Sequence, residues 1–246
     1  MHKHTSFLYK TLTTLKDIFI SLIELIYPRT CIVCARSLFK GEKYICTQCL
    51  YDFPLVYSKD GHEELLINKT SKYIIPKRAF SLFYYNKNSQ YKNLIHQIKY
   101  HFDAHLAIHL GYMLGIQLLK ENIKIDYLLP ISLHKKRKRK RGFNQAEKIA
   151  VGINQTLKST IQENLIIRTI NNETQTHKTS QQRQTNVENI FQRNTNIKSI
   201  ETILTNKNVL IIDDIITTGA TINSFISCIS NIPNIKIYIA CLAQTT

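Results

Sequence analysis

Residues 209–221 read Val-Leu-Ile-Ile-Asp-Asp-Ile-Ile-Thr-Thr-Gly-Ala-Thr, and this stretch decides the fold class expected of the chain. Its first four residues are apolar and β-favouring, which predicts a buried strand, and the small residues at its end predict a turn that opens a helix. The N–H groups and hydroxyls of such a turn suit a phosphate, as does the positive end of the helix. The carboxylates of Asp213 and Asp214 only accept hydrogen bonds, so they suit two adjacent ribose hydroxyls. The stretch therefore predicts a sugar-phosphate site.

The same stretch resembles, at every position, the phosphoribosyl-pyrophosphate (PRPP) signature of the type I phosphoribosyltransferases. One alternative is an ordinary strand-to-helix turn capped by an aspartate, but two adjacent carboxylates carry a desolvation cost that a purely structural turn would avoid. A phospho-acceptor aspartate of the receiver type is another, although that residue normally lies early in its domain. The sequence contains neither a P-loop nor a Gly-x-Gly-x-x-Gly motif, which disfavours both of those nucleotide-binding folds.

The length and charge of the chain limit its class. A chain of 246 residues has room for one substantial α/β domain and a small appendage. Hydrophobic residues make up 43% and charged residues 20%, which indicates a globular protein rather than a disordered one. The formal net charge of +16, from 33 Lys and Arg against 17 Asp and Glu, suggests a polyanionic partner such as nucleic acid or a membrane surface.

Residues 1–27 are expected to form an amphipathic helix, because apolar residues recur at helical spacing between Leu8 and Ile26. The apolar stretch of residues 15–27 is too short and too charged to span a membrane, and no small-residue cleavage site follows it. Packing on the rest of the protein is therefore favoured over membrane attachment. With no export signal, the expected compartment is the reducing cytoplasm, where cysteine pairs favour metal over disulfides.

Four cysteines in two Cys-x-x-Cys pairs predict a zinc-binding module over residues 28–55. The ligands would be Cys31, Cys34, Cys46 and Cys49, and the eleven residues between the pairs suffice for a hairpin. Four protein ligands leave no open position, so the Zn²⁺ would be structural. Thioredoxin-like redox chemistry is the alternative, but no βαβ pattern surrounds either pair. Cys228 and Cys241 are expected in the core.

Strand-like and helix-like segments alternate along the rest of the chain. Residues 56–120 read as a connector with an aromatic strand at 80–85 and a long helix at 91–119, which has a possible break near residues 100–103. Residues 121–246 are expected to form the phosphoribosyltransferase-like domain. Its predicted strands are 125–133, 165–170, a strand beginning at 209, and 235–242, and its predicted helices are 143–157 and 221–229. The alternation predicts an α/β fold with a parallel sheet flanked by helices, whose ligands bind beyond the carboxyl ends of the strands.

Seven consecutive basic residues, Lys135–Arg141, follow the strand predicted to end near Ser132. The default interpretation is a solvated loop or a nucleic-acid patch. Because the run lies at the same sheet edge as Asp213, contact with a pyrophosphate is an equally good hypothesis, and both can hold. The nucleic-acid candidates are Lys135, Lys136, Arg137, Lys138 and Arg139.

Several motifs together resemble the ComF family of competence proteins. They are Pro-Ile-Ser-Leu-His at residues 130–134, Lys-Arg-Gly-Phe-Asn-Gln-Ala at 140–146, the PRPP signature and the paired cysteines. Lys99-Tyr100 resembles the family's Lys-Tyr, although Phe102 stands where a Gly is usual. The segment from Thr174 to Phe191 is similar to the family's Thr-Gln…Arg…Asn-Val…Phe stretch. By that likeness residues 171–190 form the hood that closes over PRPP, rather than an ordinary loop.

The resemblance implies roles for individual residues. Asp213 and Asp214 would hold the ribose hydroxyls, directly or through Mg²⁺. The 5′-phosphate would lie in the turn formed by Thr217, Thr218, Gly219, Ala220 and Thr221. Ser132, Lys140 and Arg141 would neutralise the pyrophosphate, and Lys178 or Arg183 from the hood would complete the charge stabilisation. An acceptor nucleophile would then attack C1 of the ribose.

Two functional hypotheses follow. The first is a PRPP-binding phosphoribosyltransferase-like protein of the ComF family that acts in DNA uptake during natural transformation, with PRPP or a phosphoribosyl nucleotide and the uptake machinery as partners. The second is a single-stranded DNA-binding competence factor that uses the phosphoribosyl pocket for sensing or strand contact, without transferase activity. Phe143, Tyr100 and Tyr112 could stack on bases, although core packing is the simpler explanation of these rings.

Overall fold

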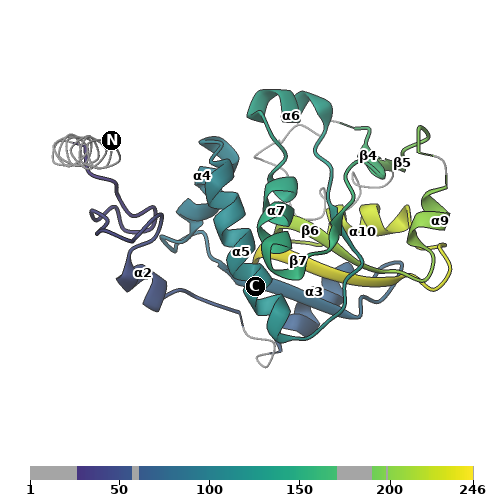
Figure 1. Cartoon of the computed structure of the whole chain (residues 1–246), viewed down its shortest axis with the longest axis horizontal. Helices are drawn as coiled ribbons and strands as arrows, with labels where there is room; N and C mark the ends of the chain where they lie inside the picture. The colour runs from purple at the N-terminus through teal and green to yellow at the C-terminus, as the bar shows by residue number, and fades with distance from the viewer. Residues whose placement is uncertain (1–26, 57–60, 171–189, 198, 246) are drawn as a thin grey trace, which may run out of the picture. The chain divides into compact units, whose positions relative to one another are not determined.

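The computed structural model describes residues 27–56, 61–170, 190–197 and 199–245 (Figure 1). The chain divides into two compact units, one ending at Phe53 and the other beginning at Pro54, and each is described by itself. The expected N-terminal helix, apart from Tyr27, and the expected hood, apart from Ile190, lie outside the described residues.

The first unit is built around the two cysteine pairs. An isolated antiparallel bridge joins Thr30 to Ser37, and the Ala35 N–H donates to the Cys31 carbonyl at 2.8 Å to close the first turn. The second pair overlaps the short helix α2, Thr47–Tyr51. Glu42 ties the intervening loop to this helix, because its carboxylate accepts the backbone N–H groups of Phe39 at 2.7 Å and Thr47 at 2.6 Å.

The second unit contains a parallel sheet of five strands in the order β1-β7-β6-β2-β3. These strands are β1 (Arg78–Tyr85), β2 (Tyr127–Pro130), β3 (Thr160–Ile161), β6 (Asn208–Ile216) and β7 (Lys236–Thr245). The domain boundary expected between residues 120 and 121 would divide this sheet. The strand β1 lies before that boundary, yet it pairs with β7, which lies after it near the C-terminus. The parallel α/β architecture predicted from the alternating segments is confirmed.

Helices cover both faces of the sheet (Figure 1). On one face α5 (Ala104–Lys120) packs on β1 and β7, and α7 (Gln145–Leu157) packs on β2 and β6. On the other face α3 (His62–Thr70) packs on β1, and α10 (Ala220–Ser227) packs on β6. Successive strand residues point to opposite faces, so Val209 and Ile211 join the core beneath α10, and all four residues 209–212 are fully buried.

Close packing of α5 against α7 explains two of the glycines. A Cβ on Gly152 would lie 2.1 Å from the carbonyl oxygen of Ile108, and one on Gly111 would lie 2.4 Å from that of Ile149. The two helices therefore meet backbone to backbone, which holds α7 firmly over β2 and β6.

The remaining elements complete the second unit. The long helix expected over residues 91–119 is broken where predicted, into α4 (Lys92–Tyr100) and α5. The other described elements are α6 (Lys135–Arg141), α9 (Ile200–Leu204) and the antiparallel pair of β4 (Ile166–Arg168) and β5 (Phe191–Arg193). Cys241 is buried in β7 as expected, and Cys228 is half-buried at the end of α10.

Three sequence-based expectations are corrected. The basic run Lys135–Arg141 is a helix rather than a loop, because Lys and Arg are good helix formers, His134 caps its start, and Gly142 ends it at φ +78°. The segment 165–170 pairs with β5 outside the main sheet rather than joining it. Tyr100 and Tyr112 are 60% and 40% exposed, so core packing does not account for these two rings.

Candidate functional site

The two aspartates lie where β6 extends past its neighbour β2. Pairing between these strands ends at Pro130 and Ile212, and a last hydrogen bond joins the Ile131 N–H to the Ile212 carbonyl at 2.9 Å. The strand β6 then continues to Ile216 alongside β7 alone. The acids are therefore inside a strand rather than at its end, but they still lie at the carboxyl edge of the sheet, where parallel α/β folds bind ligands.

The two carboxylates have different environments. Burial, followed by the neighbouring Asp214 carboxylate, raises the pKa of Asp213 to about 7, against the opposing effect of the Asp214 N–H, Lys99 and Arg168. Asp214 instead forms an ion pair, with Lys99 Nζ at 3.1 Å from its Oδ1. At neutral pH the site thus holds one paired carboxylate and one that titrates near that pH.

Lys99 is a site residue that sequence reasoning did not assign to the site. It lies in the last turn of α4, whose buried face carries Leu94, Ile95 and Ile98. The Lys99 side chain is 22% exposed and the Asp214 side chain is 13% exposed, so the ion pair is largely withdrawn from water. The Lys99-Tyr100 motif was the only available signal, because nothing in the spacing of the chain relates Lys99 to Asp214.

The turn after β6 has the geometry that a phosphate loop needs. Gly219 precedes α10 with φ +74°, and a Cβ there would lie 2.1 Å from the Lys69 carbonyl oxygen. That carbonyl is held in place by the Asn223 side-chain amide, which donates to it at 2.8 Å. Thr217 is exposed and Thr218 half-buried, and the first turn of α10 begins at Ala220. The hydroxyls of Thr217 and Thr218 and the N–H groups at the start of α10 therefore follow the two acids directly along the chain.

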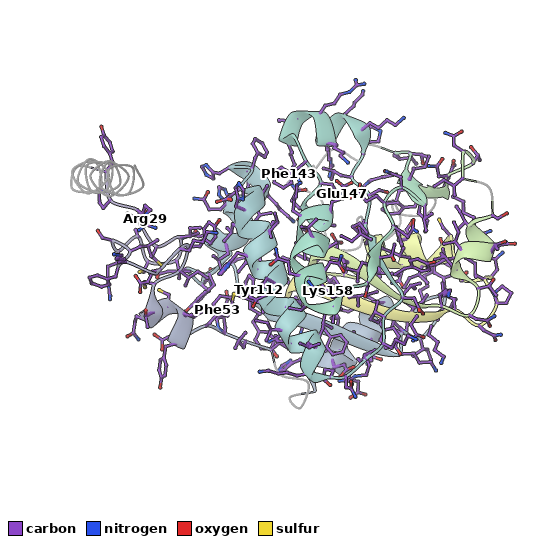
Figure 2. The ribbon with its side chains drawn as sticks, viewed as in Figure 1. Arg29, Phe53, Tyr112, Phe143, Glu147 and Lys158 are labelled. Carbon is purple, nitrogen blue, oxygen red and sulfur yellow. The ribbon has the colours of Figure 1, made fainter. Side chains whose placement is uncertain are left out.

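The segment after β2 is tied to α7 by its own polar residues. Asn144 is buried, donates to the Ile131 carbonyl at 2.9 Å and accepts the Ala146 N–H at 3.2 Å, so one side chain caps α7 and fixes the end of β2. Lys138 Nζ lies 2.8 Å and 2.9 Å from the two carboxylate oxygens of Glu147. Glu147 and Phe143 lie at the end of α7 next to α6, and Lys158 is at its other end (Figure 2).

The three residues assigned to pyrophosphate have separate surroundings. The Ser132 hydroxyl is buried and donates to the Ile166 carbonyl at 2.8 Å. Arg141 is half-buried and donates from Nη1 to Gln145 Oε1 at 3.0 Å, while Lys140 is exposed at the end of α6. Lys178 and Arg183 lie outside the described residues.

Arg168 is a second residue that the sequence did not single out. It ends β4, half-buried, with its guanidinium carbon 5.6 Å from the centre of the Phe191 ring. Burial and the positive charge of Arg137 lower the pKa of Arg168, and the Asp213 carboxylate opposes them. The fold therefore brings a cation from β4 to the acids of β6, although the two strands belong to different sheets.

The predicted metal ligands of the first unit lie together. The sulfur atoms of Cys31, Cys34, Cys46 and Cys49 all lie within 4.8 Å of one another. Zinc bonded to four thiolates at about 2.3 Å spaces them about 3.8 Å apart, and the Cys34 and Cys46 sulfurs are 3.7 Å apart. Burial alone would raise the pKa of Cys31, but N–H groups of Cys46, Cys34 and Val33 lower it to about 7, which favours the thiolate at this position. Burial and the neighbouring thiols instead raise the pKa of Cys49. The donor set fits a tetrahedral metal.

Comparison with known proteins bears on the second unit. Residues 140–245, which run from the end of α6 to the end of β7, match the family model of the phosphoribosyl transferase domain. With its parallel sheet and flanking helices, the second unit has a type I phosphoribosyltransferase-like fold. A solved structure similar to this chain is a hypoxanthine phosphoribosyltransferase from Staphylococcus aureus, at 18% identity and a TM-score of 0.36, covering 65% of this chain and 73% of that one. No curated protein matches the chain.

Among the described residues, no helix is both long enough and apolar enough to cross a membrane.

Proposed function

We propose that this protein binds PRPP at the carboxyl edge of its sheet and acts as a phosphoribosyltransferase-like protein of the ComF family. One observation carries the proposal. The strand β6 extends past β2 and carries two adjacent carboxylates in this extension. It then leads directly into the turn at Gly219 and the start of α10. The match of residues 140–245 to the phosphoribosyl transferase domain supports the same conclusion.

In this proposal the chain supplies acceptors for the sugar and donors for its phosphates. Asp213 and Asp214 accept the ribose 2′- and 3′-hydroxyls, and their carboxylates also fit Mg²⁺, which would neutralise phosphate charge when bound. The 5′-phosphate lies in the turn of residues 217–221. Ser132, Lys140, Arg141 and the hood residues Lys178 and Arg183 are the proposed stabilisers of the departing pyrophosphate. The acceptor is a base or an amine.

Calorimetry tests the proposal. PRPP in the presence of Mg²⁺ should bind the wild-type protein, and the double variant Asp213→Asn/Asp214→Asn should lose affinity by on the order of tenfold or more, because two charged acceptors are lost. A matched control, Asp52→Asn/Asp103→Asn, changes the same charge away from the strand. Equal affinity of the wild type and the β6 double variant would refute PRPP binding at this edge. Release of pyrophosphate with a panel of bases and amines then tests transfer.

The cysteine cluster is proposed to hold one structural Zn²⁺. The four sulfurs leave no ligand position for substrate, so zinc would stabilise the first unit and take no part in the chemistry of the second. A reducing cytoplasm, which we propose as the compartment, would keep the thiols available to the metal.

Binding of single-stranded DNA is a second candidate function, favoured by what α6 exposes. Four of its cations are exposed to solvent, and they are Lys135, Lys136, Arg139 and Lys140. A hollow of about 460 Å³ is lined by Lys135, Lys138, Arg139 and Gly142. Tyr100 and Phe102, at the end of α4, are 60% and 39% exposed and can stack on bases. This surface would serve the proposed role in DNA uptake, with the uptake machinery as a further partner.

The salt dependence of DNA binding tests this second function. Replacing Lys135, Lys136 and Arg139 by Gln should reduce the log–log salt slope by about 0.7 for each phosphate contact that is lost. The control replaces Lys120, Lys124 and Lys236, which are exposed and lie toward the opposite edge of the sheet. An unchanged slope in the α6 variant, or an equal change in the control, would remove the support for DNA binding by α6.

A further inference from the structure

The outer side of α5 is apolar where it meets solvent. The helix has 17 residues, and the last of them, Lys120, is its only Asp, Glu, Lys or Arg. Its inner side packs on α7 and the sheet. On the outer side Tyr112, Ile116 and Leu119 are 40%, 36% and 57% exposed, and Val151 is exposed on the neighbouring α7 (Figure 2 labels Tyr112). A helix that is apolar on all sides is normally covered on all sides, and an exposed apolar patch marks a site of protein association.

The residues of this outer side are spaced symmetrically about Tyr112. Ile108 and Ile116 lie four residues before and after it, and His105 and Leu119 lie seven residues before and after it. Steps of three and four residues keep all five on one side of the helix. The side is therefore self-complementary under a two-fold axis, which brings the same patch of two copies together. If a second α5 lies antiparallel across Tyr112, Ile108 of each copy meets Ile116 of the other, and His105 meets Leu119.

The charges at the two ends of α5 favour the antiparallel order. Asp103 caps the start of the helix, where its Oδ1 accepts the Leu106 N–H at 2.8 Å, and Lys120 ends the helix. These two residues lie nine positions before and eight positions after Tyr112. An antiparallel pair therefore places Asp103 of one copy near Lys120 of the other, whereas a parallel pair would place like charges together.

The charge of the whole chain makes a second copy the best-matched occupant of this face. With a formal net charge of +16, two copies repel each other wherever Lys and Arg are exposed. The helix α6, for example, consists of Lys and Arg alone. Because α5 has no such side chain before Lys120, two copies can approach there without that cost. A helix of this length spans about 25 Å, which suits a small protein–protein interface.

A hollow at the end of α5 continues the apolar side. Its volume is about 210 Å³, and it includes Asn122, ten residues after Tyr112. Phe102, ten residues before Tyr112, is 39% exposed. An antiparallel pair therefore brings this exposed aromatic position of one copy toward the hollow of the other. The apolar lining of the hollow consists of Leu119, Ile123, Ile125 and Leu157.

We propose that the outer side of α5 is a homodimer interface, in which two copies of this chain pack antiparallel across Tyr112. The apolar centre of the interface is formed by Ile108, Tyr112, Ile116 and Leu119, and its two ends are joined by Asp103 and Lys120. None of these residues belongs to the proposed PRPP or zinc sites, so the inference stands independently of the proposed function. Because one helix supplies most of the contact, the dissociation constant should be on the order of 10 μM.

Analytical ultracentrifugation of the full chain tests the interface. The wild type, with a chain mass of 28.6 kDa, should pass from monomer to dimer as its concentration rises. Tyr112→Glu and Ile116→Glu should each weaken the dimer by on the order of tenfold or more, because each places a carboxylate in the apolar centre. Ile75→Glu is the matched control, since it adds the same charge at an isoleucine that is 72% exposed between α3 and β1.

A charge exchange tests the antiparallel order. Leu119→Lys alone should weaken the dimer, and adding His105→Glu should restore affinity, because each introduced lysine then faces the introduced glutamate of the other copy. In a parallel pair the same double variant would set like charges against each other and weaken the dimer further.

Three results would overturn the proposal. A wild type that stays monomeric up to about 300 μM has no such interface. Glu variants that dimerise as tightly as the wild type would place the contact elsewhere. A monomer in which hydrogen exchange of α5 rises when Leu12 and Leu15 are replaced by Glu would assign the cover of α5 to the chain's own residues 1–26. Thermal melts check that each variant folds, and if Tyr112→Glu does not, Leu119→Glu decides, with a weakened dimer expected.

Discussion

The cysteine cluster and the carboxyl edge of the sheet depend on their surroundings in opposite ways. In the described part of the first unit, the buried apolar residues besides the cysteines are Val33, Ile45 and Phe53. The edge residues Asp213 and Asp214 instead follow four fully buried residues in the middle of a covered sheet. Under the proposed zinc binding, the fold of the first region depends on the site, because a unit with a small core gains much of its stability from a bound metal. In the second the site depends on the fold. Removing the cysteine thiolates should therefore unfold the first unit, whereas removing the two carboxylates should leave the second unit folded.

Removal of zinc should have the largest effect. Purified protein should carry about one Zn²⁺ per chain, and Cys46→Ser or a strong chelator should unfold residues 27–53, because zinc binding supplies roughly 10 kcal/mol or more to such modules. Metal analysis and NMR of the backbone amides measure this. Cys228→Ser is the control, since Cys228 lies outside the cluster. Protein without zinc that keeps a folded first unit would contradict the prediction.

The pH dependence of stability should identify Asp213. In the unfolded chain this carboxyl has its ordinary pKa of 3.8, whereas in the folded chain the pKa is about 7. The folded state binds more protons between these values, so this residue makes stability fall as pH rises through that window, by at most about 4 kcal/mol. The variant Asp213→Asn should lack this pH-dependent fall in stability. The melting temperature of the variant minus that of the wild type should therefore increase from pH 5 to pH 8. Parallel pH profiles of the two proteins would contradict this origin of the shift.

Gly219→Ala should destabilise the second unit by about 2 to 4 kcal/mol. The new Cβ would collide with the Lys69 carbonyl oxygen, and the backbone at φ +74° is unfavourable for alanine. Chemical denaturation measures the loss. Gly142→Ala is a matched control, because Gly142 also has a positive φ of 78° but a Cβ there would meet nothing within 4 Å. Equal losses in the two variants would show that the φ angle alone, and not the close contact, constrains Gly219.

Lys99→Met should have the smallest effect on stability, about 1 kcal/mol, since the ion pair with Asp214 retains some contact with solvent. Its main consequence should be electrostatic: without the ammonium group the pKa of Asp213 should rise further, because Lys99 is one of the groups that lower it. NMR titration of the carboxyl carbons measures this shift. Lys92→Met, at the exposed start of α4, is the control. An unchanged Asp213 titration would contradict the coupling.

Local patterns predicted the features whose cause is local. The spacing of the cysteines sufficed to place four sulfurs together, and the apolar run before Asp213 sufficed to predict a buried strand that carries the acids to the carboxyl edge of the sheet. The helix of Lys135–Arg141 was missed because its charge was read as a loop signal, although His134 and Gly142 are ordinary capping residues. The end of β6 was placed too early, because pairing with β7 carries the strand past the acids to Ile216.

By itself the sequence determined the parallel α/β class, the cysteine cluster and the position of the acidic pair beside a glycine turn. Only the tertiary structure decided which cations meet those acids. Lys99 comes from α4 and Arg168 from β4, and neither has a fixed spacing from Asp213 along the chain. Their meeting depends on how α4 packs in the second unit and on where the pair of β4 and β5 lies beside the main sheet. Periodicity and motif spacing carry no information about such long-range contacts, because these are set by the packing of the whole unit.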